Sequence, residues 1–246
     1  MTNGNTACWQ EIESLLLDRE NPEQALHLMR FFKTGEGEYG EGDAFLGVKV
    51  PVTREIVGKF KRVATLDDVE RLTRSPWHEV RLSGFLLAVE IYRRVRRSEE
   101  ERRHLVDFYL SILDRGNNWD LVDLVAPKIL GDWLLDNPDE RVILDELAAH
   151  DDSLWHQRVS IVSTWTLIRD GEFEEALRLS EKFLSHRHDL IHKATGWMLR
   201  EVGKRNGLPD LLAFLDAHAP RMPRTMLRYA IEKLPEQTRQ HYLHLK

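Results

Sequence analysis

Apolar residues recur at intervals of three and four positions along almost the whole chain, for example over 105–113 and 208–215. This spacing places apolar side chains on one face of an α-helix. The strict alternation of apolar and polar residues that is typical of half-buried strands is absent. The pattern therefore predicts an all-α protein with about a dozen helices in pairs joined by short loops.

One stretch departs from the helical pattern. Residues 34–47, TGEGEYGEGDAFLG, hold glycines that would destabilise a helix interior. A phosphate-binding loop is a second interpretation, but the stretch lacks the Gly-Lys-Ser/Thr ending of such loops. It also carries four acids that would repel phosphate: Glu36, Glu38, Glu41 and Asp43. We expect an ordered loop or lid between the first helices, and no bound nucleotide.

Similar nine-residue windows recur along the chain. Their fifth positions are separated by 42, 35, 35 and 35 residues, a near-constant period that is typical of two-helix HEAT-like repeats. Stacked repeats place equivalent positions in a row along one face, so this column of fifth positions should line a concave surface. The sequence therefore predicts a HEAT-like helical-repeat solenoid, an α-α superhelix with a basic concave groove, as one domain over 1–246. The column, with one earlier window added, comprises Arg54, Arg81, Asp123, Arg158, Lys193 and Arg228.

Five of the six column residues are cationic. Lys and Arg at the spacing of the repeats can follow a phosphate backbone and release its counterions. We therefore expect Arg54, Arg81, Arg158, Lys193 and Arg228 to bind DNA. The other interpretation is that charged residues simply prefer helix surfaces, but the regular period argues against it for the set.

The sixth column residue is a carboxylate, Asp123. Trp119 lies four residues before it, and Trp197 lies four residues after Lys193, so both indoles share the face of the column. Indole faces and a carboxylate can together stabilise a cationic or oxocarbenium-like species. Large aromatic residues at helical spacing usually belong to a core, which is the expectation for Trp133 and Trp165. Asp123, Trp119 and Trp197 are thus the candidate catalytic residues.

The charge of the chain is unevenly distributed. The net charge of −6 argues weakly against a nucleic-acid partner. Residues 186–246, however, hold 11 Lys and Arg against 6 Asp and Glu, a net of +5, whereas the remainder has 24 against 35, a net of −11. This asymmetry indicates a basic functional surface on an otherwise acidic protein.

Other features narrow the class of protein. Charged residues interrupt every apolar stretch well before a membrane span could form, and no secretory signal is visible, so we expect a cytoplasmic protein without a membrane partner. The single cysteine, Cys8, excludes cysteine-based zinc frameworks. His78-Glu79 begins like a zinc-protease motif but lacks its second histidine, and His188 and His192 have no convincing third ligand. We expect a monomer with no metal and no cofactor.

Four motifs in order resemble the AlkD-type bacterial DNA alkylation-repair glycosylases. The resemblance runs from about residue 30 to residue 234, and FLGVKVP at 45–51 also resembles the early segment of that family. The four motifs are NNWDLVD at 117–123, LWHQRVSIV at 154–162, KATGWMLREVGK at 193–204 and MPRTMLRYAIEKL at 222–234.

The resemblance implies an all-helical HEAT-like fold whose groove holds double-stranded DNA, and monofunctional excision of N3- and N7-alkylated purines. The catalytic carboxylate of the family falls on Asp123, its two lesion-side tryptophans on Trp119 and Trp197, and its groove arginine on Arg158. An early aromatic residue near the DNA, commonly Tyr, falls on Phe31. The alternative is a non-catalytic HEAT-like module that binds unusual DNA or a protein, because fold alone does not define function.

Overall fold

The computed structural model describes residues 7–245, and these residues form two compact units that divide between Val125 and Ala126. No strand occurs among residues 7–245, where a single isolated bridge between Ala44 and Trp77 is the one β feature. The predicted all-α class is therefore confirmed, while the solenoid and its concave groove stay predictions. Within the same residues, no helix combines the length and the apolar character needed to cross a bilayer.

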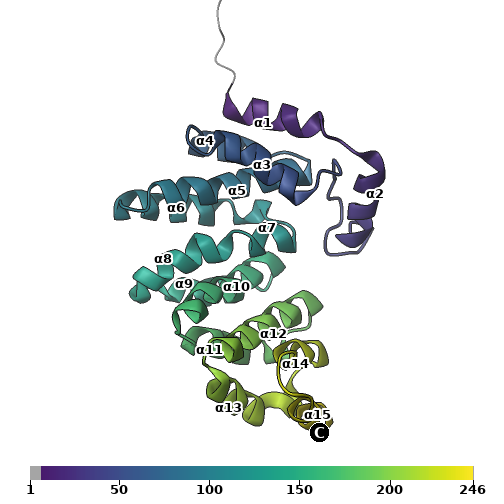
Figure 1. Ribbon diagram of the computed structural model, residues 1–246, viewed down its shortest axis with the longest axis vertical. Coiled ribbons are helices and arrows are strands. Elements are labelled where there is room, and N and C mark those ends of the chain that lie inside the picture. Colours follow the sequence, from purple (N-terminus) through teal and green to yellow (C-terminus); the bar gives the residue numbers. More distant parts are fainter. Residues whose placement is uncertain (1–6, 246) are drawn as a thin grey trace, which may run out of the picture. The chain divides into compact units, whose positions relative to one another are not determined.

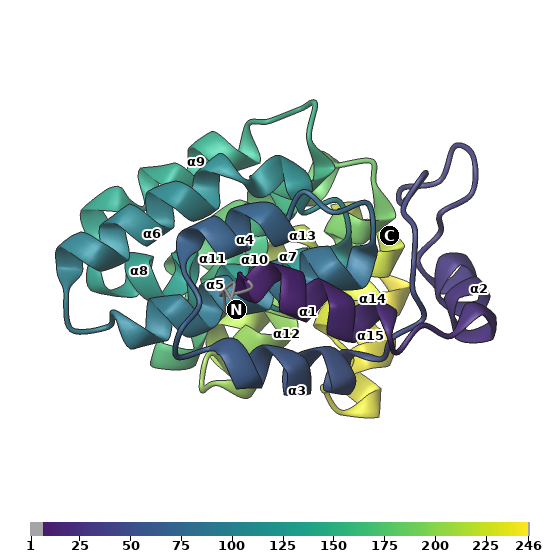
Figure 2. The same ribbon diagram turned by 90° about the horizontal axis from the view of Figure 1, so that it is seen from above.

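The first unit contains seven α-helices and one single-turn 3-10 segment among the described residues. They are α1 (Cys8–Leu17), α2 (Pro22–Phe31), α3 (Val50–Phe60), α4 (Leu66–Leu72), α5 (His78–Arg94), α6 (Glu99–Ser111), η1 (Leu113–Arg115) and α7 (Trp119–Asp123). Helix α5 is the core of this unit and contacts α1, α3, α4, α6 and α7 (Figure 2). It is buried on nearly all sides, as expected for a helix without a continuous polar face. Gly84 lets α5 approach α4 closely, because a Cβ there would lie 2.9 Å from the Cβ of Leu72.

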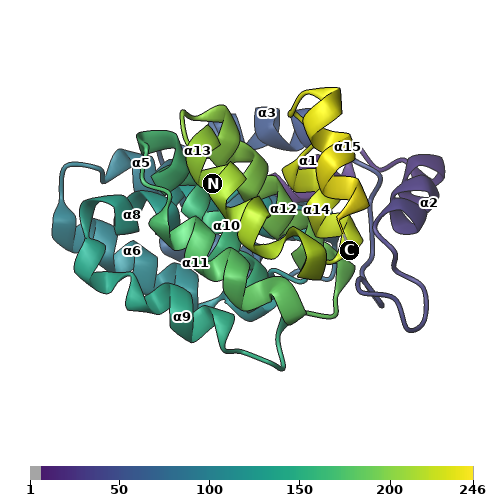
Figure 3. The same ribbon diagram turned by 90° about the horizontal axis from the view of Figure 1, so that it is seen from below.

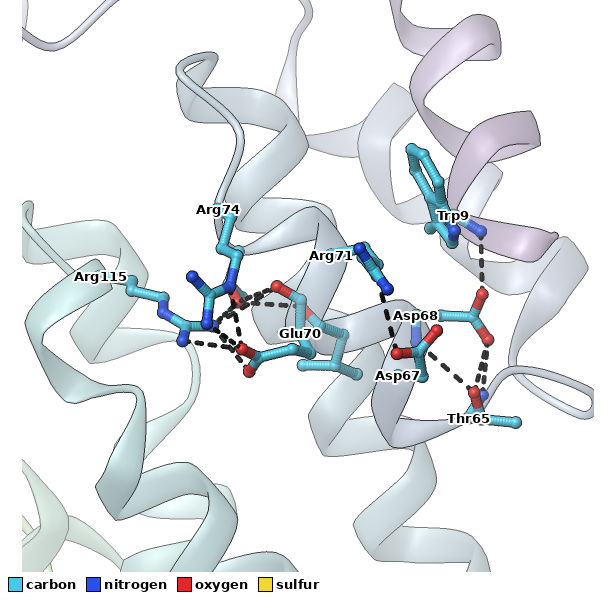
Figure 4. Close-up of polar contacts among 10 residues, drawn as sticks. Trp9, Thr65, Asp67, Asp68, Glu70, Arg71, Arg74 and Arg115 are labelled. Carbon is cyan, nitrogen blue, oxygen red and sulfur yellow. Dashed lines mark hydrogen bonds and ion pairs between the residues drawn. The ribbon is translucent and has the colours of Figure 1, made fainter.

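Polar contacts fasten the outer helices of this unit (Figure 4). Asp68 on α4 accepts a hydrogen bond from the backbone N–H of Trp9 at 3.0 Å, which ties α1 to α4. Glu70 on the same helix binds Arg115 at 2.8 Å and Arg74 at 2.6 Å. The hydrogen bond from Arg115, above all, lowers the pKa of Glu70 to about 2. Carboxylates thus fix helix α4 to α1, through Asp68, and to η1, through Glu70.

The second unit repeats one arrangement of helices. Helices α10, α12 and α14 pack side by side, while α11 and α13 pack against them as a second row (Figures 1 and 3). Gly196 lets α12 approach α14, because a Cβ there would lie 2.4 Å from the carbonyl oxygen of Met226. The elements are η2 (Ala126–Lys128), α8 (Leu130–Asp136), η3 (Pro138–Glu140), α9 (Val142–Ala148), α10 (Leu154–Asp170), α11 (Glu174–Lys182), η4 (Phe183–Ser185), α12 (Asp189–Lys204), α13 (Leu208–His218), η5 (Ala219–Arg221), α14 (Arg224–Ala230) and α15 (Glu236–His244).

The helices begin in register with the sequence repeat. Helices α10, α12 and α14 start at residues 154, 189 and 224, which reproduces the 35-residue period within the second unit. The column residue is the fifth residue of α3, α7, α10, α12 and α14, and the fourth residue of α5, whose N-cap is Trp77. Each member of the column therefore lies in the first turns of its helix.

The glycine-rich stretch 34–47 is irregular, as predicted, and has two parts. Its tip is closed by hydrogen bonds within the loop, from Gly40 to the carbonyl of Lys33 and from Gly42 to that of Thr34. The carboxylates of Glu38 and Glu41 accept from the backbone of the tip itself, from Gly35 and Gly37. The base, from Asp43 onward, is buried against the helices. Figure 2 shows α2 and this loop together at one edge of the first unit.

Candidate functional site

Helix α7 carries two of the candidate catalytic residues, Trp119 as its first residue and Asp123 as its last. The side chain of Asn118 caps the helix and accepts a hydrogen bond from the Trp119 N–H at 2.9 Å. The three intervening residues, 120–122, are buried, whereas Trp119 and Asp123 are only partly buried. The i, i+4 spacing thus brings an indole and a carboxylate to the same partly exposed face of the helix.

Asp123 is close enough to a buried phenol, that of Tyr109, to affect it electrostatically. Burial, and after it the negative charge of Asp123, hold the pKa of the Tyr109 hydroxyl well above its usual range. Tyr109 is only 1% exposed, so Asp123 has the protein interior on one side while part of the residue remains open to solvent. A carboxylate in this position remains accessible from outside.

Aromatic rings surround Trp119. Its indole stacks on Phe32 with the ring centroids 5.1 Å apart, and it meets Phe31 edge to face at 6.0 Å. Phe31, the residue that matches the early aromatic of the resembled family, is 58% exposed. Trp119 and Phe31 thus form a partly exposed aromatic surface at the end of α7 that is one turn from Asp123.

Behind this surface lies a buried group of charges that joins three segments. The imidazole of His78 on α5 binds Asp43 of the loop at 2.7 Å and Asp120 of α7 at 3.0 Å. Arg81 donates to the other oxygen of Asp43 at 2.5 Å. His78, Asp43 and Asp120 are each less than 5% exposed, and two positive charges here face two negative ones. This balance is what makes buried ionic groups tolerable.

The two carboxylates determine the protonation of His78. Burial alone would lower its pKa, but the charges and hydrogen bonds of Asp120 and Asp43 raise the pKa of His78 to about 9. For Asp43, burial would raise the pKa, and the hydrogen bond and charge of His78 together with Arg81 outweigh it, so the pKa lies below its ordinary value. His78 is therefore an imidazolium at neutral pH that donates from both ring nitrogens.

Sequence reasoning missed this group. In the sequence, His78-Glu79 stands out only as an incomplete zinc motif, and Asp43 only as an acid that would repel phosphate. The neighbouring Glu79 also has a structural role, since its carboxylate accepts from the backbone N–H groups of Leu46, Gly47 and Val48. A signal did exist: a His-Glu pair at the start of a helix whose middle, 85–92, is almost entirely apolar must find partners when it is buried.

The predicted DNA-binding residues of the first unit differ in exposure. Arg54 on α3 is exposed. Arg81 is only 8% exposed and donates to Asp43, to Asn117 and to the carbonyls of Ser75 and Pro76. These internal contacts favour a structural role for Arg81 over a direct contact with phosphate.

The remaining candidates lie together in the second unit, in the first turns of α10, α12 and α14. Arg158 is 5% exposed and donates to the carbonyl of Leu190 at 2.6 Å, which links α10 to the start of α12. Lys193 is partly exposed and forms an ion pair with Asp189 at 2.8 Å. Trp197, one turn further along α12, is also partly exposed, and Arg228 on α14 is exposed.

The histidines that precede and begin α12 use their ring nitrogens internally. His186 contacts Gln157 through Nε2 at 2.9 Å and accepts from the His188 N–H through Nδ1. His188 accepts from the Leu190 N–H, and burial lowers the pKa of both imidazoles. Among residues 7–245, no group of three or more His, Cys, Asp or Glu residues is placed to hold a metal ion. These histidines thus organise the start of α12.

Comparisons with known proteins identify the family. Residues 12–234 match the family described as DNA alkylation repair enzyme. The fold is similar to a solved structure described as a predicted DNA alkylation repair enzyme from Enterococcus faecalis, with a TM-score of 0.67, 18% sequence identity, and coverage of 88% of this chain and 97% of the other. No protein with curated annotation matches the chain. Because the family match spans most of the sequence, this chain belongs to the DNA alkylation repair enzyme family.

Proposed function

We propose that the protein is a monofunctional DNA glycosylase that excises cationic N3- and N7-alkylated purines. The observation that carries this proposal is the pairing of Asp123 with Trp119 on the partly exposed face of α7, beside the exposed ring of Phe31. Family membership supports damaged DNA as the substrate. A protein that only binds DNA would have no need of a lone carboxylate in a column of cations.

The chemistry follows from the lesion. Cleavage of an N-glycosidic bond builds positive charge on the sugar while the base departs. A purine alkylated at N3 or N7 is already cationic and leaves as a neutral base, so a strong general acid is not needed. A carboxylate that stabilises the oxocarbenium-like sugar and orients or deprotonates the attacking water completes the reaction. We assign both tasks to Asp123.

The tryptophans and cations would hold the DNA. Trp119 and Trp197 would contact the sugar and lesion through their ring faces, which attract cations. Lys193, Arg228 and Arg54, which are exposed or partly exposed, would bind phosphates. Arg158, which is buried like Arg81, would act by holding α10 to the start of α12. No nucleophilic lysine is required, so the expected product is an abasic site without strand cleavage.

The direct test is single-turnover incubation with duplex DNA that carries one N7-methylguanine, followed by alkali to reveal abasic sites. Wild type should release the base. Asp123→Asn should lose at least about 100-fold of the excision rate, because the neutral amide neither stabilises an oxocarbenium ion nor deprotonates water. The matched control is Asp67→Asn, which neutralises an exposed carboxylate on α4 and should excise at the wild-type rate.

Two outcomes would overturn the proposal. If wild type binds the duplex but releases no base, the protein is a binding module. If Asp123→Asn and wild type excise equally fast, another residue performs the chemistry.

A further inference from the structure

Asp43 contacts helix α7 through more than one path. Its carboxylate binds His78, which in turn binds Asp120, the second residue of α7. The same carboxylate accepts a hydrogen bond from Asn118, the N-cap of α7, at 3.4 Å. Arg81 and Asn117, just before α7, are connected by a further hydrogen bond at 3.0 Å. One loop carboxylate is therefore linked to both the cap and the first turn of the helix that carries Trp119.

A stack of rings runs parallel to these hydrogen bonds. The His78 imidazolium lies face to face with Phe45 of the loop at 4.3 Å, with an interplanar angle of 17°. Phe45 stacks on Phe32 at 5.0 Å, and Phe32 stacks on Trp119 at 5.1 Å. A cation over an aromatic face is held by the ring quadrupole. The imidazolium thus begins a continuous stack whose last member is the indole of the candidate site.

Helix α7 has little means of holding its own orientation. It is five residues long, whereas isolated helices shorter than about 12 residues are marginal in water. Its stability and direction must come from tertiary contacts. These are the apolar burial of Leu121 and Val122 and, among the polar contacts of its first turn, those to His78 and Asn118. A small rotation of so short a helix would turn Trp119 and Asp123 together.

We propose that Asp43 and His78 are positioning residues for base excision: through Asp120, Asn118 and the Phe45–Phe32 stack, they set the direction in which α7 presents Trp119 and Asp123. This inference rests on the proposed function of Asp123. In this proposal, the base of the glycine-rich loop, from Asp43 onward, is a rigid support for helix α7. Neither residue touches the DNA or the reacting atoms in this scheme.

The first experiment separates excision from binding. Asp43→Asn keeps the shape of the side chain but removes the charge that His78 and Arg81 require. We expect the single-turnover excision rate at saturating enzyme to fall about 10- to 100-fold, the range that follows from displacement by about 1 Å at a catalytic site. The dissociation constant for the duplex should stay within about twofold, because the phosphate contacts are unchanged. Glu38→Gln is the matched control, since Glu38 is a carboxylate of the same loop that contacts only the loop tip and Lys33.

The second experiment reports position without using activity. Fluorine NMR of protein containing 5-fluorotryptophan gives one signal for each of the seven tryptophans, and Trp119→Phe assigns the signal of Trp119. In Asp43→Asn the Trp119 signal should shift or broaden. Those of Trp133 and Trp165, in the second unit, should not move and serve as internal references. Should Asp43→Asn fail to fold, Phe45→Leu, which interrupts the ring stack but stays apolar, takes its place in both experiments.

The outcomes distinguish the two proposals. A displaced Trp119 signal with slower excision and unchanged binding supports positioning. An unchanged Trp119 signal, or a wild-type excision rate in folded Asp43→Asn, overturns it and leaves the network a purely structural role. If wild type itself excises no base, the proposed function fails, and the NMR comparison alone decides whether Asp43 orients α7.

Discussion

Helices α7 and α12 carry similar residues but are held in different ways. Each presents a tryptophan four positions from a charged column residue: Trp119 before Asp123, and Trp197 after Lys193. Helix α12 is 16 residues long and is fixed by apolar packing and by the close approach of its backbone to α14 at Gly196. Helix α7 has five residues and is held by buried charges from the loop and from α5. The element that carries the candidate catalytic carboxylate therefore depends on buried polar contacts, whereas α12 depends on close apolar packing against its neighbouring helices.

The largest effect should come from the helix contact that stabilises α12. In Gly196→Ala, the added Cβ would lie 2.4 Å from the Met226 carbonyl oxygen and 2.6 Å from the Tyr229 Cβ, so the two helices must separate. We expect a loss of about 3 kcal/mol in the free energy of unfolding, measured by urea denaturation. Gly58→Ala on α3 is the matched control, because no atom lies within 4 Å of its added Cβ. It should gain up to about 1 kcal/mol from helix propensity. Equal stability of the two variants would contradict the close packing of α12 on α14.

The next effect concerns the charges that hold α7. The pKa of His78 in the folded protein, about 9, lies above the ordinary value of 6.5, so its stabilising contribution is complete below pH 6.5 and is lost as the pH rises to 9. The groups that face His78 are Asp43 and Asp120, with Arg81 on the far side of Asp43. Wild type should lose on the order of 2 kcal/mol of unfolding free energy between pH 6.5 and pH 9. His78→Gln, measured by urea denaturation at the same two pH values, should show a clearly smaller loss. Identical pH dependence in the two proteins would mean that His78 is not the titrating group.

The smallest effect tests the cations of α12 and α14. Lys193→Ala and Arg228→Ala should each weaken duplex binding by about 1 kcal/mol and reduce the slope of log K against log salt by about 0.9, the value for one lost phosphate contact. Lys59→Ala is the control, since Lys59 is an exposed lysine near the end of α3 that pairs with Glu55. Unchanged slopes in both column variants would exclude these residues from the DNA interface.

Much of the fold follows from local patterns. The three- and four-residue spacing of apolar positions determines the helices, and the 35-residue period predicts where α10, α12 and α14 begin. The shared face of Trp119 and Asp123 was also predictable, because i, i+4 geometry is a property of a single helix.

Contacts between distant segments could not be predicted in this way. The pairing of Asp43 with His78, and of His78 with Asp120, depends on the path of an irregular loop and on the packing of two helices. The burial of Arg81 and Arg158 has the same origin, since their partners include a loop carboxylate and the carbonyl of Leu190. In the sequence these arginines look like Arg54 and Arg228, which are exposed.

The division of the glycine-rich loop has a practical consequence. The backbone of its tip donates to Glu38 and Glu41 of the same tip. The contacts of the loop with His78 and Glu79 begin only at Asp43. Chain length can therefore change within residues 35–38, which are exposed, without disturbing the contacts of the loop with His78 and Glu79, whereas Gly40 is buried against Phe32 and Asn118. The tip is therefore the part of the loop where new sequence, such as an affinity tag or a labelling site, can be inserted.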